Sequence, residues 1–219
     1  MNSDYPYFIP HKGKYIGTEK CLWDQHVLVL GYSHHCGVCT IEECKSHLNP
    51  DCKKMTIDLV QDHIAGKDNK KNALYKFDEI MFSNIERPNR KQLWESISFY
   101  NFLQIAVPES STDSHQFVGE FEEESFWEVL EELRPNSVIV WGNSEDTGLY
   151  NCLPGDFNDG RWIKYGSFFA NGEEIKIDAI KLKNNQLIKV LPINHPSYHG
   201  KYMKSTKYWK NQIDEFLKL

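Results

Sequence analysis

Three short segments of this 219-residue chain carry side chains that could bind or act on a flat, polar ligand. They contain Gly31, Tyr32, Ser33, His34 and His35 in the first, Asn101 in the second, and His195, Pro196 and Ser197 in the third. An amide such as that of Asn101 offers a hydrogen-bond donor and an acceptor side by side. An imidazole titrates near neutral pH, so a histidine can orient a water molecule and take its proton. These residue types predict a polar binding or catalytic site, provided that folding brings the segments together.

The hydrophobic pattern predicts the elements that would position these residues. Apolar, β-branched runs at 26–30 (HVLVL) and 137–141 (SVIVW) each stop at a glycine, as buried strands that feed a loop do. Further strands are predicted at 98–105, around Asn101, and as hairpin strands within 163–191, before a run at 188–193. Helical spacing predicts helices at 55–64, 74–82 and 90–97, an acidic helix that ends at Arg134-Pro135, and a C-terminal helix. This alternation indicates an α/β fold whose parallel strands end at one edge, where such proteins bind ligands.

Four segments, in order along the chain, resemble motifs of the uracil-DNA glycosylase superfamily. VLVLGYSHH resembles the strand that leads into Gly-Gln-Asp-Pro-Tyr-His, SFYNFLQ the strand with a base-reading Asn, SVIVWGNSEDTG the strand followed by Trp-Gly, and INHPSYHGKYMKS the His-Pro-Ser motif. The resemblance spans nearly the whole chain and implies one domain over residues 1–219. The fold that it implies has three layers, α/β/α, around a central, mostly parallel four-stranded sheet.

The resemblance also implies how the pocket would excise a damaged or deaminated base from DNA. Asn101, beside Gly31, would hydrogen-bond the Watson–Crick edge of an extruded base. His195 would donate to the base O2, where negative charge grows as the N-glycosidic bond breaks. Pro196 and Ser197, helped by Lys201, would hold the backbone phosphate. The resemblance therefore implies a nucleic-acid or nucleotide partner and hydrolysis that requires no cofactor.

Aromatic residues near these segments are candidate stacking partners for a base. Phe77 and Tyr32 are two such candidates, because a flat ring can stack on any base. The ordinary alternative for each is a place in the hydrophobic core.

The first segment departs from the superfamily in a way that bears on catalysis. Ser33 stands where the uracil-excising members have an Asp, and a hydroxyl cannot supply that negative charge. His34 or His35 could instead act as a general base for water. A non-catalytic module that binds a nucleotide or nucleic acid in the same pocket is therefore the main alternative. A serine acyl hydrolase using Ser33 and His195 ranks below both, because its strained turn needs glycine at the position of His35.

A cysteine-rich loop over residues 34–52 predicts a second kind of site. It contains Cys36, Cys39, Cys44 and Cys52, with histidines interspersed. In a cytoplasmic protein this density favours metal over disulfides, and a Cys-x-x-Cys turn directs two thiolates to one ion. We expect a structural zinc in preference to an iron–sulfur cluster, with reduced free thiols as the alternative.

Composition limits the partners of the chain. The formal net charge of −6 excludes a uniformly basic DNA-coating protein, so any nucleic-acid contact has to be local. From residue 181 onward the chain contains eight lysines but only two acidic residues, and this excess of positive charge predicts a local basic patch. No run approaches the ~18 apolar residues of a membrane helix, and the first residues lack the layout of a secretory signal. We therefore expect a cytoplasmic monomer with no membrane partner.

Overall fold

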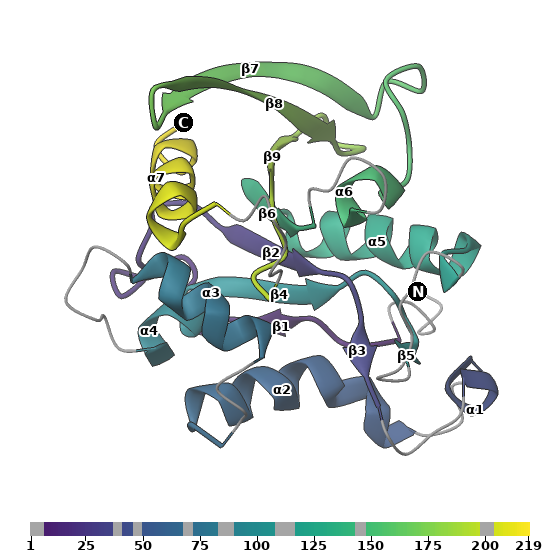
Figure 1. The fold of residues 1–219 in the computed structure, drawn as a ribbon. Coiled ribbons are helices and arrows are strands. Elements are labelled where there is room, and N and C mark those ends of the chain that lie inside the picture. Colours follow the sequence, from purple (N-terminus) through teal and green to yellow (C-terminus); the bar gives the residue numbers. More distant parts are fainter. Residues whose placement is uncertain are drawn as a thin grey trace.

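A mixed sheet of seven strands lies at the centre of the computed structural model, which describes residues 7–36, 41–45, 50–67, 72–82, 90–107, 117–142, 148–197 and 204–219. Helices lie against both faces of this sheet (Figure 1). The strands, in spatial order, are β1 (His11–Lys12), β4 (Ile97–Asn101), β2 (Val27–Gly31), β6 (Ser137–Trp141), β9 (Leu187–Ile193), β8 (Glu173–Lys181) and β7 (Trp162–Ala170). A separate small sheet pairs β3 (His34–His35) with β5 (Ala106–Val107).

The strands of the main sheet run in both directions. Neighbours are parallel from β4 through β2 and β6 to β9, whereas β1 is antiparallel to β4, and β8 is antiparallel to both β9 and β7. The predicted four-stranded, mostly parallel sheet is therefore wrong. The physical reason lies in two tight turns: Asn171 and Gly172 close the β7–β8 hairpin with φ of 54° and 79°, and Asn185, at 68°, lies between β8 and β9. The hairpin that these turn residues predict extends the main sheet instead of standing apart from it.

Helices lie between and after the strands along the described part of the chain. They are α1 (Ile41–Lys45), the 3-10 helix η1 (Pro50–Lys54), α2 (Met55–Ile64), α3 (Ala73–Met81), α4 (Arg90–Glu95), α5 (Glu120–Leu133), α6 (Leu149–Cys152) and α7 (Thr206–Phe216). The side chain of Asn72 accepts a hydrogen bond from the Tyr75 amide at the start of α3 (2.8 Å), and Ser205 caps α7 in the same way. The end of α5 predicted at Arg134 is confirmed, because Arg134 takes a left-handed φ of 46°.

The two faces of the sheet pack into separate hydrophobic clusters. Alternate strand residues such as Val29 and Phe99 pack with α2, α3, α4 and α7, whereas Leu30 and Tyr100 pack with α5. This alternation follows from the two-residue period of a strand. A polar strand residue therefore packs near the helices that cover its own face of the sheet.

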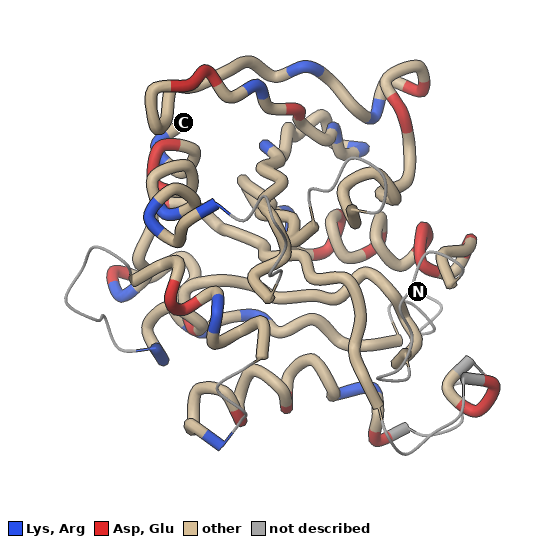
Figure 2. The backbone as a smooth tube through the Cα atoms, in the orientation of Figure 1, with Lys and Arg blue, Asp and Glu red and all other residues tan. Residues whose placement is uncertain are grey.

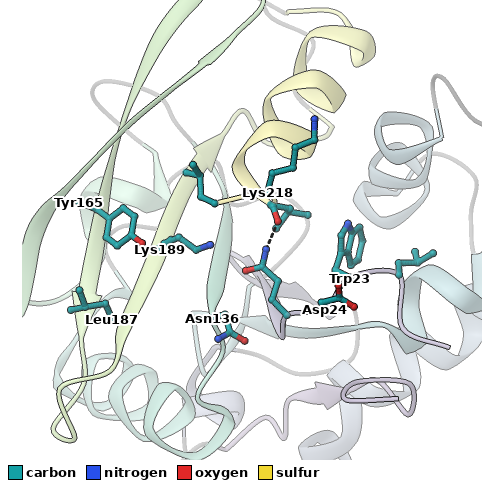
Figure 3. A pocket seen from close by; sticks show the side chains of 11 residues that line it. Trp23, Asp24, Asn136, Tyr165, Leu187, Lys189 and Lys218 are labelled. Carbon is teal, nitrogen blue, oxygen red and sulfur yellow. Dashed lines mark hydrogen bonds between the residues drawn. The ribbon is translucent and has the colours of Figure 1, made fainter. Parts of the chain in front are cut away.

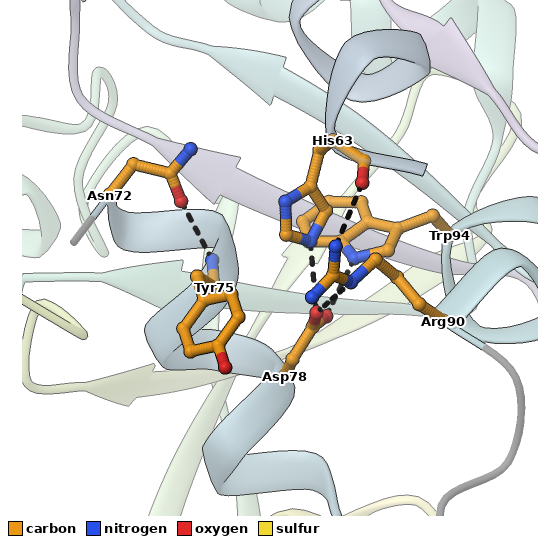
Figure 4. Close-up of polar contacts among 6 residues, drawn as sticks. All are labelled: His63, Asn72, Tyr75, Asp78, Arg90 and Trp94. Atoms are coloured by element: carbon orange, nitrogen blue, oxygen red, sulfur yellow. Dashed lines mark hydrogen bonds and ion pairs between the residues drawn. The ribbon is translucent and has the colours of Figure 1, made fainter. Parts of the chain in front are cut away.

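A buried polar network ties α2, α3 and α4 together beneath the first of these faces (Figure 4). The carboxylate of Asp78, which is 4% exposed, accepts hydrogen bonds from His63 Nε2 (3.0 Å), Arg90 Nε (2.7 Å) and Trp94 Nε1 (2.8 Å). Arg90 also donates from Nη1 to the backbone oxygen of His63 at 3.0 Å. With three donors on one carboxylate, this network acts as a structural junction between the helices.

Candidate functional site

The carboxyl ends of the parallel strands lie side by side and carry the predicted site residues. Gly31 ends β2 and pairs in register with Asn101, which ends β4. Trp141 ends β6 and pairs with Ile193, two residues before His195. The structure thus places the three predicted segments along one edge of the sheet.

The amide of Asn101 is held by a buried hydrogen-bond chain. Its Nδ2 donates to Nδ1 of His34 (3.2 Å), and Nε2 of His34 lies 2.8 Å from Oγ1 of Thr56 in α2. Burial, and then the nearby charge of His35, lowers the pKa of His34 to about 3, so the ring is neutral at pH 7. Because Nδ1 accepts from the amide, the ring proton sits on Nε2 and points to Thr56. Both nitrogens are occupied, so His34 orients Asn101 and is poorly placed to act as a general base.

Residue 31 has to be a glycine because the Asn101 amide lies against its backbone. A Cβ at residue 31 would lie 2.1 Å from Oδ1 of Asn101 and 3.2 Å from the Phe99 ring. The backbone of Gly31 has no left-handed φ, so the need for glycine comes from close packing alone.

We expect Gly31→Ala to displace the Asn101 amide and break its bond to His34. The added methyl would lower the free energy of unfolding by about 1–3 kcal/mol, as overpacking of a core does. Urea denaturation measures this change. Gly119→Ala is the control, because its added Cβ meets only Glu122 Oε2, at 3.5 Å. Equal losses in the two variants would contradict the required close approach.

His195 is held as a neutral hydrogen-bond donor. Its Nδ1 accepts from the backbone amide of Ser197 at 3.2 Å, which leaves the ring proton on Nε2. Burial, and then the charge of His35, lowers the pKa of His195 to about 4. Around pH 7 His195 can therefore donate a hydrogen bond from Nε2 without carrying a charge.

Asn101 and His195 lie on the same side of the sheet. Asn101 shares its face of β4 with Phe99, and the Phe99 ring packs on Trp141 with centroids 5.3 Å apart. Trp141 in turn packs edge-on against His195 at 6.0 Å. His35 is exposed, and its charge when protonated contributes to the lowered pKa of both His34 and His195. Thr56, which bonds His34, and Trp141, which contacts His195, are members of the site that the sequence analysis missed.

Other predicted residues lie elsewhere or cannot be placed. Tyr32 packs with the α5 cluster, on the opposite face of the sheet from Asn101. Phe77 is 1% exposed and packs between Trp94 and Trp141 (6.1 and 5.2 Å), so its ring belongs to the core. Ser33, Pro196 and Ser197 are half-buried, with the last two forming the turn after His195. Lys201 lies outside the described residues.

The lysines predicted to form one basic patch are spread over the molecule (Figure 2). Lys210 is buried against Asp214, and Lys218 pairs with Glu215 at 2.6 Å. Lys204 and Lys207 are exposed at the beginning of α7, which follows the His195 turn in sequence. Among the described residues that follow this turn in the sequence, Lys204 and Lys207 are the first lysines, and neither forms an ion pair with a described carboxylate.

Three of the four predicted zinc ligands lie around one small cluster. Cys44 is buried and its Sγ accepts a hydrogen bond from the Ala106 amide at 3.0 Å, while Cys36 and Cys52 pack against the same cluster. Cys39 lies outside the described residues. Among the residues that the structure describes, no three potential metal ligands gather at one point. The zinc site therefore remains a prediction.

Comparisons with known proteins identify no family for this chain, so its site has to be interpreted from the chemistry of its residues. No protein-family model matches the chain, and a search of curated proteins finds no relative. None of the helices in the described ranges is long and apolar enough to cross a membrane.

Proposed function

We propose that this chain is a uracil-DNA glycosylase-like protein that binds an extruded base and hydrolyses the N-glycosidic bond of a damaged or deaminated nucleotide in DNA. The observation that carries the proposal is that a fixed amide, Asn101, and a neutral imidazole donor, His195, lie on the same side of the sheet. The proposal includes a nucleic-acid partner and a cytoplasmic monomer.

Asn101 would read the base. One hydrogen of its Nδ2 is used by His34, which leaves the second hydrogen and Oδ1 for a pyrimidine O4 and N3–H. Because His34 is itself anchored on Thr56, the amide is fixed before the base arrives. Such preorganisation lowers the cost of binding.

His195 would stabilise the departing base. As the bond between sugar C1′ and the base nitrogen breaks, its electron pair goes to the base and negative charge gathers on O2, where Nε2–H of His195 can donate. Water then bonds to C1′ and loses a proton. In its neutral form His35, which is exposed and next to His34 in the chain, would accept that proton, because both nitrogens of His34 are occupied.

The test uses oligonucleotides that contain uracil, hypoxanthine or xanthine, single-stranded and mismatched. We expect abasic sites from the wild-type protein, and loss of about 10²–10³ in rate for His195→Ala, the usual effect of removing one oxyanion donor. Asn101→Ala should abolish product, because the base loses the amide that reads it. His26→Ala is the matched control, because His26 is half-buried at the opposite ends of the strands. Equal activity in the His195 and His26 variants would refute the proposed role of His195.

A non-catalytic module that binds a nucleotide or nucleic acid is the second candidate, and Ser33 is the observation that favours it. Without a carboxylate at this position, nothing there offsets the cationic sugar of the transition state. Binding of the same oligonucleotides without abasic product would support this alternative. Ser33→Asp would then restore the missing charge, and product from that variant alone would identify a glycosylase site that has lost its carboxylate.

A further inference from the structure

A separate pocket lies at the opposite edge of the sheet, beside the amino ends of the parallel strands (Figure 3). Its volume is about 770 Å³, and its walls include Trp23, Gln25, Asn136, Tyr165, Leu187 and Lys189. Gln25 and Asn136 precede β2 and β6, and Leu187 and Lys189 begin β9. A cavity of this size holds a small molecule.

Lys189 presents an unpaired positive charge to this pocket. The residue is only 8% exposed, and its Nζ extends from β9 into the pocket in Figure 3. Its Nζ lies over the ring of Phe216, 5.8 Å from the ring centroid. Within the described part of the chain, no carboxylate lies within ion-pair distance of Nζ, whereas the other buried lysine, Lys210, pairs with Asp214.

The polar groups around Lys189 do not compensate its charge. Asp24 lines the same pocket without forming an ion pair with Lys189. The Gln25 amide is already used, since it donates to Leu217 O and accepts from Ser137 Oγ. Burial lowers the pKa of Lys189, as expected for an ammonium that lacks an anionic neighbour. A buried charge without a partner is costly, so the pocket favours an occupant that brings a negative charge.

Part of the remaining wall is apolar or aromatic and is open to a ligand. Tyr165 is 42% exposed and Leu187 38%, although both are large hydrophobic residues. Trp23 is half-buried on the other side of the pocket (Figure 3). Exposed apolar surface gathered around a cavity marks a binding site. The ligand should therefore have an apolar body as well as an anionic group.

We propose that this pocket binds a small organic anion, with its carboxylate or phosphate on Nζ of Lys189 and an aromatic or aliphatic body against Trp23, Tyr165 and Leu187. The site is separate from the one at the carboxyl ends and does not depend on the function proposed for it.

The test measures binding of phenylacetate and phenyl phosphate to the whole chain by saturation-transfer NMR and calorimetry, with benzyl alcohol as the uncharged analogue. We expect millimolar or tighter binding of at least one anion, and at least about tenfold weaker binding of benzyl alcohol. The stronger of the two anions identifies the preferred head group. Lys189→Met, which keeps the length of the stem, should weaken anion binding by at least about tenfold. Lys183→Met is the matched control and should bind as the wild type does, because Lys183 is exposed in the turn between β8 and β9, where its backbone bonds to Glu131 of α5, and it does not line the pocket.

Folding of the variants is part of the same test. Lys189→Met should be at least as stable as the wild type, because it removes a buried, unpaired charge. Leu187→Glu adds a carboxylate at the exposed start of β9 and should weaken anion binding without altering the core. The proposal is overturned if neither anion binds at millimolar concentration, if Lys189→Met binds as tightly as the control, if it unfolds, or if Leu187→Glu leaves binding unchanged.

Discussion

Replacement of Asp78 by alanine is expected to lower the free energy of unfolding by about 3–5 kcal/mol, the usual effect of removing one partner of a buried ion pair. Asp78 is the common acceptor for His63, Arg90 and Trp94, and it lies almost fully inside the protein. Without the carboxylate, the Trp94 Nε1–H and the buried side of the Arg90 guanidinium lose their partner. Each buried donor left unsatisfied costs about 1–3 kcal/mol.

Urea denaturation at pH 7 measures the effect of Asp78→Ala, and Asp62→Ala supplies the matched control. Asp62 lies in α2 of the same region, but its pair with Lys67 is exposed and spans 3.5 Å. An exposed pair of this kind contributes about 0–1 kcal/mol, so the control should unfold almost as the wild type does. Similar losses in both variants would show that the buried network does not hold α2, α3 and α4 together.

Local structure was the most predictable level of this protein. The helix at 55–64 and the strand at 137–141 are confirmed as α2 and β6, because their apolar residues follow the periods of a helix and a strand. The strand predicted at 98–105 ends early, at Asn101. Beyond that point Gln104 turns its side chain back to the backbone oxygens of Asn101 and Phe102, at 3.1 and 3.2 Å. The amide side chain that ends the strand is visible in the sequence, but its partners are not.

The order of the strands could not be predicted from the same pattern. A two-residue period shows that 173–181 is a strand, yet it does not show that β8 pairs with β9 on one side and β7 on the other. Such pairing depends on non-local hydrogen bonds and on the turns at Asn171 and Asn185. The number and direction of strands in the sheet therefore had to come from the structure.

The sequence predicts which residues form the site much better than it predicts what each of them does. Strand ends predict that Asn101 and His195 gather at one edge, and the alternation after Leu30 could have placed Tyr32 on the other face. The sequence could not show whether His34 is free to act as a general base. Its partners, Thr56 and Asn101, lie 22 and 67 residues away, and no spacing rule connects them.

Acid is expected to destabilise the fold through His34, and the direction follows from its pKa. The ring takes up a proton at pH about 6.5 in the unfolded chain but only at about 3 in the folded protein. Between these values the unfolded state binds more protons than the folded state. The folded protein therefore has its full stability with respect to His34 above pH about 6.5, and it loses stability as the pH falls toward 3. Lowering the pH from 7 to 5 should therefore reduce the free energy of unfolding by about 2 kcal/mol through this residue alone.

His34→Gln separates this effect from the rest of the titration. Glutamine keeps an amide near Asn101 and Thr56 but cannot take up a proton, so the variant should lose about 2 kcal/mol less than the wild type between pH 7 and pH 5. Urea denaturation at the two pH values measures the difference. His35→Gln is the control: His35 is exposed, and burial is the larger cause of the lowered pKa of His34, so that variant should keep most of the acid sensitivity. An acid sensitivity of His34→Gln equal to that of the wild type would mean that the ring is protonated as readily inside the protein as in water, and Asn101 would then have no neutral acceptor to orient it.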